Sequence, residues 1–186
     1  MFNEWQKVIV SADKDFIQLL DDKTILHRPI QKEYLNKNNV VEKFGIHPTN
    51  FALARAIVGD SSDNLPGVPR VGMETVAKRF SFLKEEQTYY LSSILEECAR
   101  PENKQKVYKN ILESKELIES NYDIMQLSSP MLSIQAKQGI DDTFEQYKPH
   151  YNQTEIRKLM LQDGVLTVST TDLEQRFNNI ITSFSG

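Results

Sequence analysis

Two pairs of aspartates have the types and spacing that metal-dependent chemistry requires. Asp13 and Asp15 stand two residues apart, directly after the β-branched run at 7–10, and Asp60 and Asp63 stand three apart in a turn-rich segment. In an extended chain, residues i and i+2 point the same way, so Asp13 and Asp15 can reach one point in space. The other spacing lets two carboxylates converge if the turn is helical. Both pairs offer the oxygen ligands that hard divalent cations take.

The chemistry that such a cluster supports is phosphodiester hydrolysis. Two ions held roughly 4 Å apart activate a water and stabilise the leaving oxygen. The alternative is structural, because an aspartate at a helix N-terminus is usually a cap and one in a turn usually bonds its own backbone. The chain has 26 acidic and 22 basic residues, so its excess negative charge is no larger than these four aspartates. Spacing alone leaves both interpretations open.

A second candidate site is the segment Gly67–Gly72, which lies between two predicted helices and resembles a helix–hairpin–helix turn. Its glycines let the backbone come close to a ligand. The helix that follows would present free amides near Met73 to a phosphate, and Lys78 and Arg79 lie on that helix. The alternative is a tight turn between helices with solvated charges.

The elements that must position these residues follow from apolar spacing and from glycine and proline. Residues 7–10 predict a buried strand, helix-like spacing follows over 16–20, and Pro29 stops a second strand at 24–27. Three glycines and two prolines predict irregular structure over 59–72. Helices are expected at 40–44, 48–58, 73–80, about 85–99, about 101–121, 154–162 and 171–184, with a strand or extended connector at 122–127.

Composition places the chain among ordinary globular proteins. Its 186 residues, 39% hydrophobic and 26% charged, suit one domain or a large part of one. The net charge of −4 gives no overall cationic field, which is weak evidence against nucleic-acid binding. A single cysteine, Cys98, excludes a disulfide scaffold and is expected to be a buried thiol. No apolar run approaches the roughly 18 residues that span a bilayer, and Glu4 and Lys7 interrupt any signal peptide, so a cytosolic protein is expected.

The other side chains capable of chemistry are expected to have no catalytic role, with each histidine either structural or at the surface. The three histidines are scattered without partner spacing, and Trp5 and the pair Tyr89–Tyr90 are expected in the core. The histidines are His27, His47 and His150.

Taken together, the motifs resemble the structure-specific 5′-nucleases, which include the flap endonucleases and the 5′-3′ exonuclease domain of bacterial DNA polymerase I. The resemblance covers about residues 5–80 and rests on the segments Ser11–Leu20, Phe44–Ile46 and Gly59–Val68, in the same order and spacing. Further along, residues 121–125 and 164–184 are similar to the C-terminal part of the ribonuclease H of T-even phages, a member of the same family.

The resemblance implies an α/β, predominantly helical fold. The chain would be the C-terminal part of the 5′-nuclease (PIN-like) fold with a helix–three-turn–helix DNA-binding element. Residues 1–38 would form the C-terminal edge of the nuclease α/β core with its acidic loop, 39–84 the helix–three-turn–helix region, and 85–186 a helical C-terminal region.

The resemblance also implies roles for the aspartates. Asp13, Asp15, Asp60 and Asp63 match catalytic carboxylates that bind two divalent ions, Mg²⁺ or Mn²⁺, at the scissile phosphate. Cleavage by a metal-activated water would follow.

The hairpin would grip the duplex backbone. Gly67, Arg70 and Gly72 fall on it, and the basic residues would contact phosphates. These phosphate contacts would come from Arg70, Lys78 and Arg79. A K⁺ ion would bridge the hairpin and a DNA phosphate through backbone carbonyls near Val68 and Val71, with Ser62 as a helper.

One departure from the family is large. Family members carry a further N-terminal half with most of the sheet, more carboxylates and a basic helical arch. The chain is therefore expected to work with a separate N-terminal nuclease half or by self-association, without a membrane. The complete enzyme would hydrolyse 5′ ends and flaps of DNA, or of an RNA–DNA hybrid, during primer or displaced-strand removal in a bacterial or phage-infected cell.

A competing hypothesis is a non-catalytic module that binds double-stranded DNA, in which the aspartates are structural. Under either hypothesis, Val8, Ile9 and Val10 need neighbours that the chain lacks. An exposed apolar sheet edge or face, with self-association, is therefore expected.

Overall fold

The computed structural model describes residues 4–129, 132–146, 151–165 and 167–184. It divides into two compact units, 1–130 and 131–186, which are described separately below. The predicted regions 1–38 and 39–84 both fall within the first unit, and the predicted region 85–186 extends across the division.

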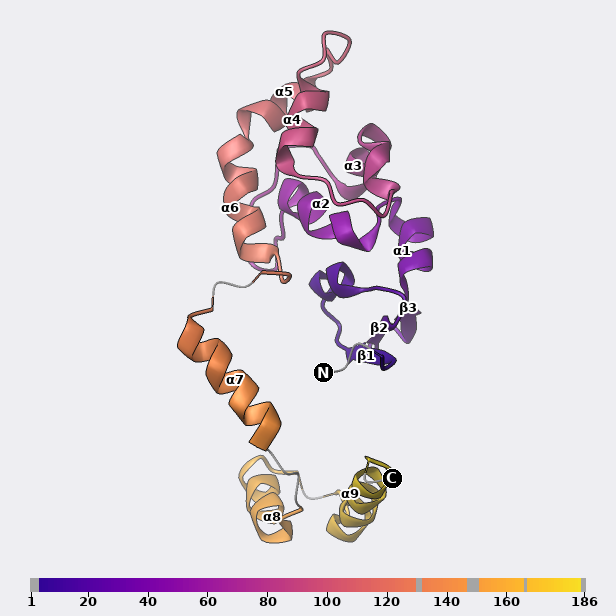
Figure 1. The fold of residues 1–186 in the computed structure, drawn as a ribbon, viewed down its shortest axis with the longest axis vertical. Helices are drawn as coiled ribbons and strands as arrows, with labels where there is room; N and C mark the ends of the chain where they lie inside the picture. Colours follow the sequence, from indigo (N-terminus) through magenta and orange to yellow (C-terminus); the bar gives the residue numbers. More distant parts are fainter. Residues whose placement is uncertain (1–3, 130–131, 147–150, 166, 185–186) are drawn as a thin grey trace. The chain divides into compact units, whose positions relative to one another are not determined.

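A three-stranded sheet opens the first unit, in the order β1-β2-β3 (Figure 1). Strand β1 (Lys7–Val10) pairs parallel with β2 (Thr24–Arg28), and β2 pairs antiparallel with β3 (Glu33–Leu35). The 3₁₀ helix η1 (Asp15–Leu19) lies in the crossover from β1 to β2. Both predicted strands are confirmed, whereas the three-residue β3 was not anticipated.

The prediction that β1 is a buried strand is wrong. Its burial alternates along the strand, so that Ile9 packs against the core while Val8 and Val10 are 51% and 64% exposed. Within the described residues β1 pairs with β2 alone. One face of β1 is therefore apolar and open, as the sequence led us to expect.

Two helices, α1 and α2, precede the glycine-rich turn, and a third, α3, follows it. Helix α1 (Lys37–Phe44) begins at a capping box on Asn36 and ends at Gly45, which adopts the left-handed conformation with φ 68°. A 3₁₀ turn, η2 (Pro48–Asn50), leads into α2 (Phe51–Val58).

Helix α3 (Met73–Arg79) follows the turn. Because α2 and α3 flank the predicted hairpin, the helix–turn–helix arrangement is present.

The next helices begin later than the sequence indicated. After η3 (Ser81–Lys84), helix α4 spans Leu91–Cys98, α5 Lys106–Glu113 and α6 Lys115–Met125. Residues 122–125, expected to be extended, form the last turn of α6. Helix α6 lies alongside α2 (Figure 1).

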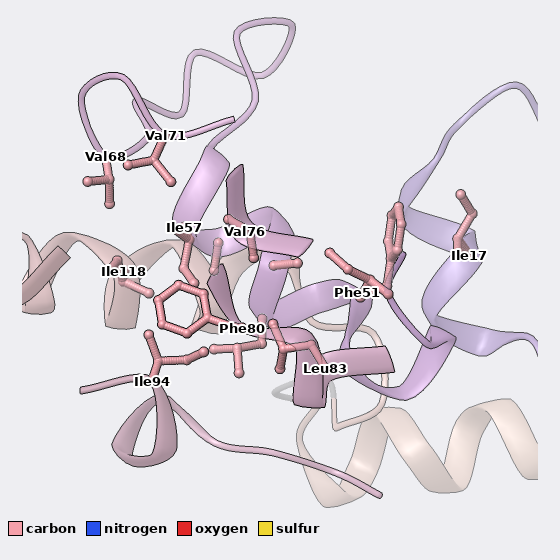
Figure 2. Packing of buried hydrophobic residues seen from close by; sticks show 14 of the residues in the cluster. Ile17, Phe51, Ile57, Val68, Val71, Val76, Phe80, Leu83, Ile94 and Ile118 are labelled. Atoms are coloured by element: carbon pink, nitrogen blue, oxygen red, sulfur yellow. The ribbon is translucent and has the colours of Figure 1, made fainter. Parts of the chain in front are cut away.

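Most of the apolar core of the first unit lies where these helices meet. Figure 2 shows the Phe80 ring among Ile57, Ile94 and Ile118, with Val68 and Val71 of the turn among the other side chains of the same cluster. These residues belong to one continuous cluster that extends to the sheet. The turn is thus held by its own buried valines.

The predicted burial of Cys98 is confirmed, but that of two aromatic residues is not. Cys98 is buried, and burial raises the pKa of its thiol to about 12. Trp5 and Tyr90, expected in the core, are instead 56% and 66% exposed.

The second unit consists of α7 (Ile134–Gln146), α8 (Gln153–Gln162) and α9 (Thr170–Phe184). The predicted helices at 154–162 and 171–184 are confirmed, and α7 was not anticipated. A hydrogen bond joins the last two helices, because the Arg157 guanidinium of α8 donates to the Thr170 hydroxyl of α9 at 3.2 Å. No helix among the described residues combines the length and apolar character needed to cross a membrane.

Candidate metal centre and nucleic-acid interface

The first aspartate pair lies in the loop that leaves β1. The Asp13 carboxylate accepts the Asp15 backbone N–H at 2.8 Å, which turns the chain into η1. The buried Arg28 guanidinium donates twice to the Ala12 carbonyl, at 2.9 and 3.2 Å, and pairs with Glu33 at 2.6 Å. The sheet therefore fixes the start of this acidic loop.

The second pair lies in a tight turn after α2. Asp60 and Leu65 exchange two backbone hydrogen bonds of 2.8 Å. The Asp60 Oδ1 atom accepts both the backbone N–H and the hydroxyl of Ser62, at 2.8 and 2.5 Å. A Cβ on Gly67 would lie 1.8 Å from a backbone oxygen of α2, so only glycine fits where the turn returns to the helix.

The two pairs meet in space. Asp15, Asp60 and Asp63 each offer a carboxylate oxygen, and these three oxygens lie within 4.8 Å of one another. Asp13 is outside that set, but it lines a hollow of about 410 Å³ together with Lys14, Asp60 and Asp63. The structure thus brings three of the four predicted carboxylates together. The fourth, Asp13, lies in the hollow that Asp60 and Asp63 also line.

Sequence reasoning missed Arg55. Its Nε atom lies 3.0 Å from Asp15 Oδ1, and its Nη2 donates to Asp60 Oδ2. Its side chain is only 13% exposed. The signal was present in the sequence, because Arg55 is the lone charge in an otherwise apolar helix that ends at the acidic turn.

The electrostatics of the two paired aspartates differ. Hydrogen bonds from Ser62, assisted by Arg55, lower the pKa of Asp60 to about 2. Burial raises the pKa of Asp15, and this outweighs the attraction of Arg55. The cluster therefore pairs a firmly ionised carboxylate with one that burial disfavours as an anion.

The donor set suits a hard divalent cation. The three converging groups are carboxylates, and such oxygens are the ligands of Mg²⁺ and Mn²⁺ rather than of soft metals. An ion there would be held by Asp15, Asp60 and Asp63.

The predicted hairpin is closed by a bond of its own and is joined to the two helices α2 and α5. The Val68 N–H donates to the Ile57 carbonyl at 2.8 Å, and the Val71 N–H donates to the Val68 carbonyl at 3.1 Å. The Asn110 side chain of α5 donates to the Pro69 carbonyl at 3.0 Å. Both valine side chains are buried, whereas Arg70 is exposed at φ 66°.

The other predicted binding residues occupy different settings. Lys78 is exposed on α3, and the Arg79 guanidinium lies over the Tyr108 ring at 5.7 Å. Gly72 is exposed at the N-cap of α3. Ser62, predicted as a helper for K⁺ at the hairpin, lines the aspartate hollow.

Sequence comparison identifies 5′-3′ exonucleases and DNA polymerases I among the relatives of this chain. The chain is 43% identical over 82 residues to the 5′-3′ exonuclease of Buchnera aphidicola, which is 42% of this chain and 29% of the relative. It is 30% identical over 161 residues to the thermostable DNA polymerase I of Thermus thermophilus, which is 85% of this chain and 18% of the relative. The chain is therefore homologous to part of the 5′-3′ exonucleases and of DNA polymerase I. No family model matches it.

Solved structures show the same fold. The bacteriophage T5 5′-exonuclease with bound divalent metal ions (zinc) superposes with a TM-score of 0.54 at 24% identity, over 63% of this chain and 42% of that one. A T5 flap endonuclease in a complex with DNA and metal ions gives 0.54 at 23% identity, over the same shares of the two chains. The predicted fold class, a mainly helical α/β part of a 5′-nuclease, is thereby confirmed. The chain spans less than a third of the Buchnera 5′-nuclease it matches.

Proposed function

We propose that this chain is part of a metal-dependent 5′-3′ exonuclease or flap endonuclease. The observation that carries the proposal is the convergence of Asp15, Asp60 and Asp63, from two distant segments, beside the anchored hairpin. Its substrates would be DNA with 5′ ends or flaps, or RNA–DNA hybrids, as in primer or displaced-strand removal. The setting would be the cytoplasm of a bacterial or phage-infected cell.

The aspartates would serve as ligands of Mg²⁺ or Mn²⁺. Asp15, Asp60 and Asp63 would hold an ion directly, and Asp13 would complete the acidic wall around a second one. When bound, such ions activate water and offset charge on the leaving oxygen.

The hairpin would bind the duplex backbone without reading sequence. Arg70 and Lys78 are exposed and available to phosphates, and Arg79 is oriented by the Tyr108 ring. Backbone carbonyls near Val68 and Val71 remain our candidates for K⁺. The T5 flap endonuclease complexed with DNA and metal ions supports a nucleic-acid role for this fold.

The complete enzyme would need further parts. The chain spans 29% of the Buchnera exonuclease, and the apolar face of β1 is open. We propose that a separate N-terminal nuclease half supplies further strands and carboxylates.

The test is cleavage of a 5′-labelled flap substrate in Mg²⁺, by the chain alone and with the N-terminal half of a related exonuclease. We expect activity in the mixture, and an Asp63→Asn variant should lower its rate about 100-fold or more, the scale of losing a transition-state electrostatic contact. The matched control is Asp141→Asn, an exposed aspartate of α7. Unchanged cleavage by Asp63→Asn would contradict the proposal.

The second candidate is a duplex-binding module with structural aspartates. The ion pairs of Arg55 with Asp15 and Asp60 favour it, because they give both carboxylates a partner within the protein. Salt-sensitive duplex binding with no cleavage in any mixture, and no Mn²⁺ binding, would establish this alternative.

A further inference from the structure

We propose that Arg55 is the resident counter-ion of the aspartate cluster, a positioning residue that a divalent ion displaces from Asp60. The inference rests on the proposed function, since it takes Asp15, Asp60 and Asp63 as metal ligands. It adds a competitor, built into α2, that sets how tightly the metal binds.

The contacts of Arg55 span two distant segments. One side of the guanidinium meets Asp15, which is 40 residues earlier, and the other meets Asp60, five residues later. A third donor, Nη1, lies 3.5 Å from the Gly59 carbonyl. The planar guanidinium can join two carboxylates at once, which a lysine ammonium on a flexible stem does poorly. Arg55 thus links the acidic loop to the acidic turn.

Both oxygens of Asp60 already have partners. Oδ1 accepts two hydrogen bonds from Ser62, which use the two lone pairs of that oxygen, and Oδ2 accepts from Arg55. A cation bound by Asp60 must therefore use Oδ2. Two positive groups on one oxygen repel each other, so the metal and the guanidinium compete there.

The surroundings limit where the guanidinium can go. Arg55 lies on a helix whose neighbouring side chains are buried, and it also lines a second hollow of about 790 Å³ beside the acidic turn. That hollow includes Asn64 and the backbone around Gly67. The displaced guanidinium can turn into it while the helix stays in place.

The alternative is that Arg55 is an ordinary stabilising ion pair that the metal leaves intact. The two possibilities differ in the metal affinity of a variant without the positive charge. Removing a competitor tightens binding, whereas removing a ligand-orienting group weakens it.

The experiment is Mn²⁺ binding to the full chain without nucleic acid, followed by electron paramagnetic resonance of the free ion. We expect Arg55→Met to bind Mn²⁺ about tenfold more tightly, the scale of one unscreened charge interaction. Its melting temperature without metal should be lower than that of the wild type, and the gap should narrow as Mn²⁺ is added. The matched control is Arg100→Met, which loses the same charge from an exposed arginine paired with Glu97 and should match the wild type.

Equal or weaker Mn²⁺ binding by Arg55→Met would overturn the inference. If that variant fails to fold, Arg55→Lys decides, because a lysine keeps the charge but not the bridge: tighter binding than wild type supports displacement, and equal or weaker binding overturns it. A wild-type chain that binds no Mn²⁺, or binds it no better than Asp60→Asn does, would instead overturn the proposed metal site itself, and the inference with it.

Discussion

At the scale of single residues, the charge of Asp60 is controlled by its hydrogen-bond partners in and beside the acidic turn. Asp60 is held ionised by Ser62 and by Arg55, and its pKa of about 2 is below the ordinary value. Its ionised form therefore contributes stability at all pH values above about 4, the unfolded aspartate value, and this contribution is lost only as pH falls toward 2. The acidic turn should stay formed under all conditions in which a nuclease would work.

His47 should also make the folded chain less stable as pH falls, as Asp60 does, but in a higher pH range. Burial lowers the pKa of His47, so its contribution to stability is complete above the unfolded value of about 6.5 and is lost as pH falls through the folded value. The ring caps η2 by accepting the Thr49 N–H. His47→Asn keeps a capping group and removes the titration.

We expect the melting temperature of the wild type to fall more between pH 7.5 and 5 than that of His47→Asn. Differential scanning fluorimetry of both proteins across this pH range measures the two melting temperatures. Parallel curves for the two proteins would show that His47 does not contribute to the pH dependence.

The candidate site could be predicted from the sequence only in part. Residue type and spacing predicted only that each pair could converge within its own loop or turn, and the resemblance to the 5′-nucleases implied that the two pairs share one site. The bridge made by Arg55 could not be predicted, since it depends on how α2 packs against a loop 40 residues away. Asp13 matches a metal-binding carboxylate of the family motif, yet in the structure its carboxylate accepts the backbone N–H of Asp15.

At the scale of elements, α6 holds the hairpin in place. The buried Asn121 amide donates to the Ala56 carbonyl at 3.0 Å and to the Pro66 carbonyl at 2.9 Å, which joins α6 to the end of α2 and the start of the hairpin. Gln18 makes a second link, because its amide bonds both Met125 and Leu127 near the end of α6. Helix α6 therefore supports both the hairpin and η1.

We predict that Asn121→Ala destabilises the chain by about 2–4 kcal/mol, because a buried carbonyl and a half-buried one lose their donor and a cavity remains. Urea unfolding measures it. Asn110→Ala is the matched control, since that amide bonds the hairpin at Pro69 from a more exposed position, and it should cost under about 1 kcal/mol. Equal costs for the two variants would show that α6 does not anchor the hairpin.

The strand or extended connector predicted at 122–127 was wrong for residues 122–125, which are helical. Ile118, Asn121 and Met125 are buried at helical intervals, so the core-facing stripe of α6 continues past residue 121. A polar residue stands in the middle of that stripe, and its burial is explained only by the carbonyls of α2 and the hairpin. Strand β3 was missed for a related reason, because three residues carry too little pattern without their partner β2.

At the scale of the whole molecule, the fold class could be predicted from the sequence, but which residues of the sheet are buried could not. The order of strand, acidic loop, helix and glycine-rich turn can be read locally, and it was confirmed. Burial of β1 depends on what covers it, and alternating exposure along the strand shows that, of its two faces, the described residues cover only one. The long-range contacts of a sheet cannot be inferred from one strand.

The open face of β1 leads to the last prediction. Val8 and Val10 point the same way and are largely exposed, and such a sheet surface pairs with another chain when one is available. We expect the isolated chain to self-associate in a concentration-dependent way. The double variant Val8→Lys, Val10→Lys should be monomeric at a similar melting temperature, because half or more of each valine is exposed. Analytical ultracentrifugation and thermal melts measure both. The control is Ile124→Lys, an equally exposed apolar residue on α6, which should leave self-association unchanged.

A wild-type chain that stays monomeric across the whole concentration range would mean that this face needs no partner. Loss of association with the N-terminal nuclease half in the same double variant would identify the face as the one that completes the enzyme.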